Sequence, residues 1–273
     1  MTKKEKIKLL LPPILVIILG WIKSKLILNN HVVSFHGNFD DWDSALKKTS
    51  TYEDSVILEK VLQATRKLRD GIVLGEQDSI TFSNPQINSN VLIGILNAFN
   101  CNKINHIVDL GGGLGTHYFQ YRKFISSQNV NWTVIELPKV VEYGKSEFSN
   151  EELSFADSLS KSENSSLVLF SCSLQYLENP YSVLDQVIEK KFSHIIFNRT
   201  PFIKNNHDRL TIQTTKEPIY NASYPAWFFC EAKLKKYFLD NGYELIDDFS
   251  NPDRVHLITG EYYFKGLTFQ KSK

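Results

Sequence analysis

The sequence predicts an α/β fold: a doubly wound, seven-stranded, mostly parallel sheet with an antiparallel C-terminal hairpin and an N-terminal helical extension. Two patterns predict this fold. From residue 104 onward, short apolar segments alternate with helical segments, as in parallel sheets that are covered by helices on both faces. No helical segment separates the last two apolar segments, so we expect them to pair as an antiparallel hairpin.

The predicted parallel strands are short and apolar, and polar or glycine residues follow them. Helical segments lie between the strands, and the clearest of these covers 179–191. A further helix over 229–242 precedes the final hairpin, which we place at 243–249 and 261–271. The segments predicted as parallel strands are 104–111, 131–137, 153–159, 166–177 and 194–202.

The segment 31–100 is predicted to form a helical cap on the domain that spans 101–273. Its first part, 35–50, mixes polar, aromatic and glycine residues, which predicts a loop that runs into a short helix. Apolar residues at helical spacing then predict two longer helices, over 52–71 and over 85–100.

Residues 1–30 combine a lysine-rich start with an apolar stretch. The uninterrupted apolar run of about 14 residues would extend about 21 Å as a helix, which is less than the roughly 30 Å of a hydrocarbon core. Lysines on both sides suit anionic headgroups. We therefore expect a cytoplasmic protein with peripheral contact between residues 7–28 and the inner face of the membrane. A helix packed on the core, a cleaved signal and a true membrane span are the alternatives that the sequence leaves open.

The composition argues against several classes of function. The net charge of +1 over 273 residues gives no reason to expect a nucleic-acid partner. The three cysteines, Cys101, Cys172 and Cys230, are far apart and follow no metal-binding spacing. We therefore predict reduced thiols and no metal site.

The first predicted strand ends in an aspartate, and a cluster of glycines follows it. Glycines at this point of a doubly wound sheet permit a tight turn and let the backbone approach a ligand closely. The helix that begins near Thr116 points free backbone N–H groups at the same place. We therefore expect a nucleoside-like ligand at this loop. The residues of the loop are Asp109, Gly111, Gly112, Gly113 and Gly115.

The loop does not fit the dinucleotide fingerprint G-x-G-x-x-G, because Thr116 or Tyr118 stands where the third glycine is needed. It resembles instead the signature D-x-G-x-G-x-G of class I methyltransferases, which bind S-adenosylmethionine. The resemblance implies that Asp109 lies near the methionine part of this cofactor, Glu136 binds the ribose hydroxyls and Asp157 faces the adenine amino group. Further candidates for cofactor contact are Leu137, Ser158, Ser171 and Ser173.

Longer motifs give a closer resemblance. They are "FHGNFDDWDSA", "DLGGGLGTHYFQY", "VIELPKVVEYG", "LFSCSLQYLENPY", "FNRTPF", "DRLTIQ" and "YPAWFF", and they run from about residue 35 to the C-terminus. Through them the chain resembles a group of methyltransferases from bacterial polysaccharide and lipopolysaccharide gene clusters. The resemblance implies the reaction class and leaves the acceptor unassigned.

A hydroxyl acceptor must lose a proton during methyl transfer, and a histidine with a near-neutral pKa is suited to take it. His117, just beyond the glycine loop, is the first catalytic candidate, and a solvated helix residue is the alternative interpretation. Arg199 is the second, because a guanidinium at the end of the fifth strand could hold an anionic acceptor; its alternative is an ion pair with Asp208 or Glu231. The candidates for acceptor binding are Tyr118, Gln175, Tyr176, Asn198, Arg209, Tyr224 and Trp227.

These observations favour an S-adenosylmethionine-dependent methyltransferase that modifies an oxygen or nitrogen of a sugar, in a small molecule or a glycan intermediate. Two alternatives stay open at this point. The chain could be an inactive cofactor-binding or scaffold protein of a glycan assembly system. It could also be a nucleotide-sugar oxidoreductase, although the third glycine and a Y-x-x-x-K motif are missing.

Overall fold

The computed structural model describes residues 32–49, 54–102, 104–125, 129–161, 167–251, 256–257 and 262–272. The predicted membrane-contacting segment 7–28 lies outside these residues. None of the described helices is long and apolar enough to cross a membrane.

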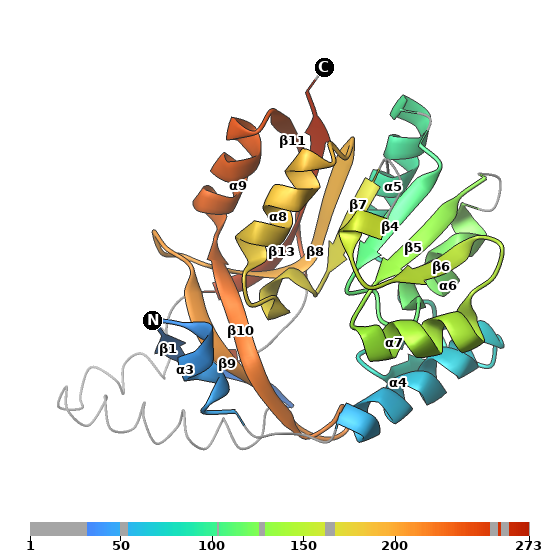
Figure 1. The fold of residues 1–273 in the computed structure, drawn as a ribbon, viewed down its shortest axis with the longest axis horizontal. Helices are drawn as coiled ribbons and strands as arrows, with labels where there is room; N and C mark the ends of the chain where they lie inside the picture. The colour runs from blue at the N-terminus through green and yellow to red at the C-terminus, as the bar shows by residue number, and fades with distance from the viewer. Residues whose placement is uncertain are drawn as a thin grey trace, which may run out of the picture.

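A seven-stranded unit forms the larger part of the main sheet and has the order β6-β5-β4-β7-β8-β13-β11. The strands from β6 to β8 pair in parallel, whereas β13 pairs antiparallel with both β8 and β11. The predicted doubly wound sheet and its C-terminal antiparallel hairpin are therefore confirmed (Figure 1). The strands of this unit are β4 (His106–Leu110), β5 (Asn131–Ile135), β6 (Leu153–Ala156), β7 (Leu167–Ser171), β8 (His194–Ile203), β11 (Tyr243–Ser250) and β13 (Tyr262–Lys271).

Four further strands extend this sheet, and the prediction of seven strands was too low for that reason. The carboxyl end of β8 pairs in parallel with β10, which continues into β9, β1 and β12. In Figure 1 the orange strands β9 and β10 run away from the seven-stranded unit toward α3. We call these four strands the accessory sheet. They are β1 (Val33–Phe39), β9 (Arg209–Thr215), β10 (Ala222–Cys230) and β12 (His256–Leu257).

The predicted loop at the start of 35–50 was wrong, because most of it belongs to strand β1. The strand is hard to see in the sequence because its pairing with β9 shifts register between His36 and Phe39. Gly37 lies in this bulge with a φ of +87°. The short helix predicted to follow is confirmed as α3 (Trp42–Leu46), which Asp41 caps through a hydrogen bond from the Ser44 N–H.

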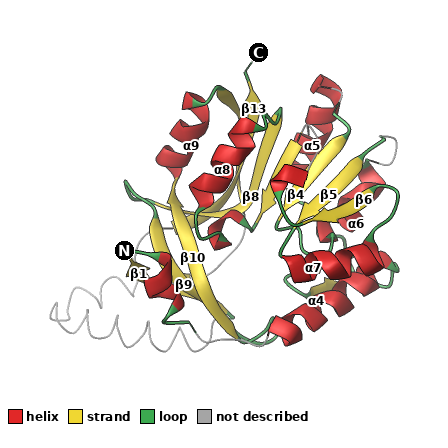
Figure 2. Ribbon diagram, in the orientation of Figure 1, coloured by secondary structure: helices red, strands yellow, loops and turns green. Residues whose placement is uncertain are grey.

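Helices cover the seven-stranded unit on both faces (Figure 2). One buried cluster joins α4, α5, α6 and α7 to the sheet, and a second joins α8 and α9 to its other face. The helices are α4 (Asp54–Arg69), α5 (Ser89–Asn102), α6 (Thr116–Tyr121), α7 (Pro138–Tyr143), α8 (Pro180–Glu189) and α9 (Glu231–Asp240). Shorter helical turns are η1 (Arg122–Phe124), η2 (Gly144–Phe148), η3 (Leu159–Lys161) and η4 (Leu174–Tyr176), and a small hairpin consists of β2 (Gly75–Gln77) and β3 (Ile80–Phe82).

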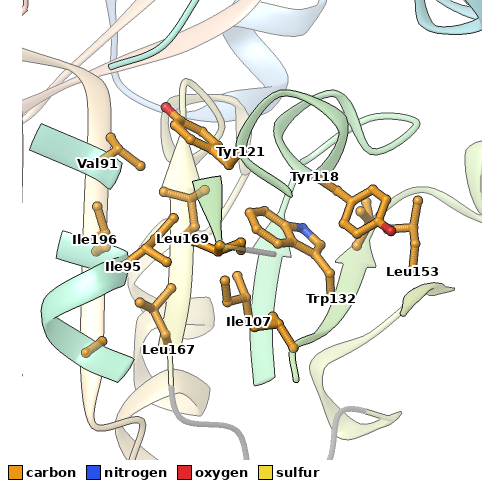
Figure 3. Packing of buried hydrophobic residues seen from close by; sticks show 14 of the residues in the cluster. Val91, Ile95, Ile107, Tyr118, Tyr121, Trp132, Leu153, Leu167, Leu169 and Ile196 are labelled. Carbon is orange, nitrogen blue, oxygen red and sulfur yellow. The ribbon is translucent and has the colours of Figure 1, made fainter. Parts of the chain in front are cut away.

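Side chains along β4 point alternately to the two faces of the sheet, and this determines the face on which Asp109 lies. Trp132 is fully buried and lies between Ile107 and Tyr118 (Figure 3). Ile107 belongs to this cluster, whereas Val108 belongs to the cluster on the other face. Because successive residues of a strand point to opposite faces, Asp109 shares the face of Ile107, on which α6 packs.

Candidate functional site

Three pockets meet at the carboxyl ends of the parallel strands. The first, the loop pocket, has a volume of about 490 Å³ and lies against the glycine loop and the ends of β5, β6 and β7. The second, the amide pocket, has about 500 Å³ and lies between α5, α6 and the end of β8. The third, the tyrosine pocket, has about 110 Å³ and faces the accessory sheet. The loop and tyrosine pockets share Cys172 and Tyr176, and the amide and tyrosine pockets share Arg199.

The glycine loop leaves bare backbone between β4 and α6. Gly111 has a φ of +75°, and a Cβ at this position would lie 2.4 Å from the Cβ of Ser173, so only glycine fits there. Gly113 has a φ of +60° and no atom within 4 Å of where a Cβ would be. Gly115, at φ +90°, is the N-cap of α6. The loop therefore presents open space at Gly113 while it packs tightly at Gly111.

Glu136 lies directly after β5 and is tied to the glycine loop. Its carboxylate accepts hydrogen bonds from the N–H of Gly113 at 3.2 Å and from the N–H of Leu137 at 2.9 Å. Burial outweighs these two bonds and raises the pKa of Glu136. The carboxylate is thus fixed by backbone donors at the wall of the loop pocket.

Most of the predicted cofactor contacts line the loop pocket. Asp157, which follows β6, lies there with its neighbour Ser158, and so does Ser173, whose buried hydroxyl has no hydrogen-bond partner among the described residues. Ser171 instead lines the amide pocket. The predicted cofactor residues that do line the loop pocket are Gly111, Glu136, Leu137, Asp157, Ser158 and Ser173.

Asp109 and His117 form a pair at the wall of the amide pocket. The fully buried carboxylate accepts a hydrogen bond through Oδ2 from His117 Nδ1 at 2.9 Å. Burial alone would lower the pKa of His117, but the charge and the hydrogen bond of Asp109 outweigh it, so the pKa is raised. The second oxygen, Asp109 Oδ1, is buried and has no hydrogen-bond partner among the described residues. The pair leaves Nε2 of His117 as the nitrogen available to a ligand.

A network of side-chain amides forms the rest of the amide pocket. Asn198 accepts hydrogen bonds from Asn88 at 2.9 Å and from Asn251 at 3.0 Å, and it donates to the Ser171 hydroxyl at 2.9 Å. These residues come from β8, from the position just before α5, from β7 and from the segment after β11. The predicted role of Asn198 as an acceptor contact remains a proposal, but its side chain is 5% exposed and already holds three partners.

The hairpin of β2 and β3 contributes two acids that the sequence had not suggested. Glu76 is buried and accepts hydrogen bonds from the Thr116 hydroxyl at 2.5 Å and from the Ser79 N–H at 2.7 Å. Asp78 lies in the two-residue turn with a φ of +54° and pairs with the Arg199 guanidinium at 3.0 Å. The only sequence feature that could have predicted this hairpin is a short turn between two three-residue strands, and such a feature is weak evidence.

The pairing of Arg199 therefore differs from both sequence interpretations. Its described carboxylate partner is Asp78, and not Asp208 or Glu231. Asp208 instead binds Lys233 and accepts a hydrogen bond from the Cys230 N–H at 2.7 Å. Glu231 pairs with lysines on α9 and β13. Arg199 does line the amide and tyrosine pockets, as its predicted location at the end of β8 required.

Four predicted acceptor residues lie away from the three pockets and serve the fold. Tyr118 packs against Trp132 and donates to Glu152 at 2.9 Å. The Gln175 amide, 1% exposed, donates to the Cys172 sulfur at 3.1 Å. The two remaining residues bind backbone oxygens: Arg209 donates to Gly37 O at 2.9 Å, and Trp227 donates to Leu177 O at 3.1 Å. Tyr176 and Tyr224, two further predicted acceptor residues, line the tyrosine pocket, and their contact with an acceptor remains a proposal.

Within the described ranges, no cluster of three or more histidine, cysteine, aspartate or glutamate residues is arranged to hold a metal ion.

Comparison with known proteins gives likeness of structure only. No family model matches the sequence, and no curated protein matches it. The N-terminal domain of EvdMO1, solved in the presence of SAH and D-fucose, matches with a TM-score of 0.47 and 12% identity over 82% of this chain and 98% of that one. Burkholderia thailandensis 1,6-didemethyltoxoflavin-N1-methyltransferase matches with a TM-score of 0.43 and 13% identity over 88% of this chain and 100% of that one.

An S-adenosylmethionine-dependent methyltransferase from Clostridium acetobutylicum ATCC 824 matches with a TM-score of 0.43 and 10% identity, over 69% of this chain and 94% of that one. At these identities and TM-scores the similarities carry no argument about ligands or activity. The function of this chain has to be argued from its own site residues.

Proposed function

We propose that this protein is an S-adenosylmethionine-dependent methyltransferase that methylates an oxygen or nitrogen of a sugar, in a small molecule or in a glycan intermediate of a bacterial surface polysaccharide. One observation carries the proposal. Gly111 and the fixed carboxylate of Glu136 line the loop pocket, at the point where doubly wound sheets bind nucleosides, and Glu136 accepts a hydrogen bond from Gly113, which faces open space.

The residues that line the loop pocket suit the ribose and the purine ring of the cofactor. Glu136 offers carboxylate oxygens to vicinal ribose hydroxyls, and Asp157 and Ser158 offer polar groups at the next strand end. Leu159, Leu177 and Val183 supply an apolar wall suited to a purine ring. Asp109 does not line this pocket and lies beside His117; its buried Oδ1, which has no hydrogen-bond partner among the described residues, is an acceptor suited to an ammonium group. When bound, S-adenosylmethionine would supply an activated methyl group.

His117 is the residue that we assign to proton removal from the acceptor. Its Nδ1–H donates to Asp109, which fixes the ring and stabilises the imidazolium that forms when Nε2 takes a proton. The raised pKa of His117 makes it a stronger base, and it also means that activity should require a pH high enough to deprotonate the ring.

Calorimetric titration tests the cofactor assignment. The wild-type protein should bind S-adenosylmethionine and S-adenosylhomocysteine, and Glu136→Gln should weaken both by roughly tenfold or more, because an amide replaces an acceptor of two ribose hydrogen bonds. Glu142→Gln, on the exposed side of α7, is the matched control and should bind as the wild type does. Absence of heat and of a thermal shift with millimolar ligand would overturn the proposal.

Two further measurements separate the alternatives. A nicotinamide cofactor that binds at the loop pocket in preference to S-adenosylhomocysteine would support an oxidoreductase. Mass spectrometry of the native glycan, with and without the protein, should show a difference of one methylene unit. An unchanged glycan together with tight cofactor binding would support an inactive binding protein.

The N-terminal segment 7–28 leads us to propose that the enzyme works at the inner face of the membrane, where its lysines would meet anionic lipids. Flotation with phosphatidylglycerol vesicles should carry the full chain upward. A chain that lacks residues 1–30 should remain at the bottom of the gradient, and equal flotation of both would contradict the proposal.

A further inference from the structure

The tyrosine pocket is the space best placed for an acceptor. It shares Cys172 and Tyr176 with the loop pocket, so a group bound in it lies beside the proposed cofactor. It shares Arg199 with the amide pocket, whose wall carries His117. An acceptor bound here therefore lies next to residues that also border the loop pocket, and next to Arg199, which also borders the pocket of the proposed base.

Hydrogen bonds hold the tyrosines of this pocket in fixed positions. Tyr176 donates to Gln213 Oε1 at 2.9 Å, and Gln213 Nε2 donates to the Tyr224 hydroxyl at 2.9 Å. Tyr224 is in turn hydrogen-bonded to Tyr220. The rings of Tyr176 and Tyr224 meet edge to face, with centroids 5.3 Å apart. The accessory sheet and η4 thus present a rigid surface of rings and hydroxyls.

These hydroxyls are uncharged. Burial, followed by the neighbouring acidic groups that include Cys172 and Asp78, raises the pKa of Tyr176 and of Tyr224 well above the usual range. Each phenol therefore keeps its proton and acts as a neutral hydrogen-bonding group.

The charges around the pocket cancel. Arg199 is the one lysine or arginine among the described residues that line the three pockets, and Asp78 pairs with it at 3.0 Å. Asp78 itself lines the tyrosine pocket, and the Arg199 charge contributes to the lowered pKa of that carboxyl. Glu76 lies nearby in the same hairpin. An anionic ligand would meet a compensated cation and additional carboxylates, which is unfavourable.

We infer that the tyrosine pocket binds one uncharged, hydroxyl-bearing ring of the acceptor, such as a neutral hexose unit, and discriminates against uronate and phosphorylated sugars. This inference rests on the proposed function and replaces the hypothesis that Arg199 holds an anionic acceptor. The pocket volume of about 110 Å³ is below the roughly 300 Å³ of a drug-sized site, which suits a single ring of a larger molecule. Tyrosine rings and neutral hydroxyls provide the stacking and hydrogen bonds that such a ring requires.

Saturation-transfer NMR with the full chain, saturated with S-adenosylhomocysteine, tests the inference. The probes are the methyl glycosides of glucose, galactose and mannose, the corresponding methyl uronosides, and the hexose 6-phosphates. At least one neutral glycoside should bind, and its uronate and phosphate counterparts should bind roughly tenfold more weakly or not at all. Equal or tighter binding of the anionic probes would overturn the inference.

Variants locate the binding. Tyr224→Phe removes one hydroxyl and keeps the ring, so it should weaken the neutral glycoside by about five- to tenfold. Asp78→Asn keeps a residue that tolerates the left-handed turn but removes the carboxylate charge beside Arg199, so the uronate should gain roughly tenfold. Asp240→Asn removes the same charge from an exposed helical pair and should change neither.

The outcomes separate the two proposals. If S-adenosylhomocysteine binds and none of the neutral glycosides does, or if Tyr224→Phe and Asp78→Asn leave all probe affinities unchanged, the acceptor inference is wrong while the cofactor assignment stands. If S-adenosylhomocysteine does not bind, the proposed function fails first.

Discussion

His117 is held between opposing electrostatic effects. Burial disfavours its charged form, and the fully buried Asp109 carboxylate favours it more strongly. Glu76 adds to the effect of Asp109, whereas Arg199 opposes it. The protonation state of this ring therefore depends mainly on the Asp109 carboxylate. A change at Asp109 should shift the pKa of His117.

Asp109→Asn should lower the pKa of His117 below its ordinary value, because burial then acts with less opposition. An NMR titration of the imidazole protons measures this directly. His36, whose pKa is already lowered by burial and which lies on β1, is the internal control and should titrate unchanged. A pKa of His117 that does not move in the variant would contradict the assigned cause.

The same pair fixes the sign of a stability effect. Since the pKa of His117 is raised in the folded state, its contribution to the free energy of unfolding is fully present below the unfolded value of about 6.5. That contribution is lost as the pH rises through the raised folded value. Denaturant titrations of the wild type and Asp109→Asn should therefore differ more at pH 5.5 than at pH 9.

At the scale of the element, the glycine loop combines a packed position and an open one. Gly111 has the side chain of Ser173 directly against it, whereas Gly113 faces open space beside Glu136. Two alanine substitutions in one loop should consequently have different effects.

Gly113→Ala should cost about 1–2 kcal/mol of stability, since the left-handed backbone is strained by a Cβ and nothing else is displaced. Gly111→Ala should lower the free energy of unfolding by about 1–3 kcal/mol more than Gly113→Ala does, because the methyl group must displace Ser173. Urea denaturation monitored by tryptophan fluorescence gives both values. Equal stability losses would show that the loop is not packed against Ser173 as described.

The elements also show what the sequence could predict. Strands β4 to β8 were predicted because they are continuous apolar runs, and Glu136 and Asp157 were found because each directly follows such a run. The accessory strands were missed: β1 contains a glycine bulge, and β10 mixes buried and half-buried positions without a regular pattern. Sequence spacing carries little information about strands with such irregular patterns.

Site residues that meet across long sequence separations were beyond prediction. Asp78 lies 121 residues before its partner Arg199, and Asn88 lies 110 residues before Asn198. No local pattern links the members of these pairs, and Asn and Asp in turns are ordinarily turn formers. The proposed cofactor side of the site is local to strand ends, whereas the proposed acceptor side is assembled by the tertiary fold.

For the whole molecule, burial is unevenly distributed. Two large hydrophobic clusters lie on the two faces of the seven-stranded unit, and the two clusters of the accessory sheet are much smaller. Because local stability follows buried apolar contact, the two regions should open with different free energies.

Hydrogen exchange followed by mass spectrometry should show this difference. Amides of β4, β5 and β7 should exchange slowest, and those of β1 and β9 should exchange measurably faster under the same native conditions. A saturating neutral acceptor should slow exchange in β9 and β10 more than in β5. Uniform exchange across all strands would contradict the uneven stability.

Strand β8 belongs to both sheets, since it pairs with β7 and β13 along its length and with β10 at Phe202 and Ile203. A chimaera that takes strands β9 and β10 from a related protein therefore has a defined junction. The donor sequence should begin after Ile203, so that the recipient keeps the whole strand with Asn198 and Arg199. A junction inside β8 would take one strand from two proteins. The part that pairs with β7 and the part that pairs with β10 would then no longer come from the same sequence.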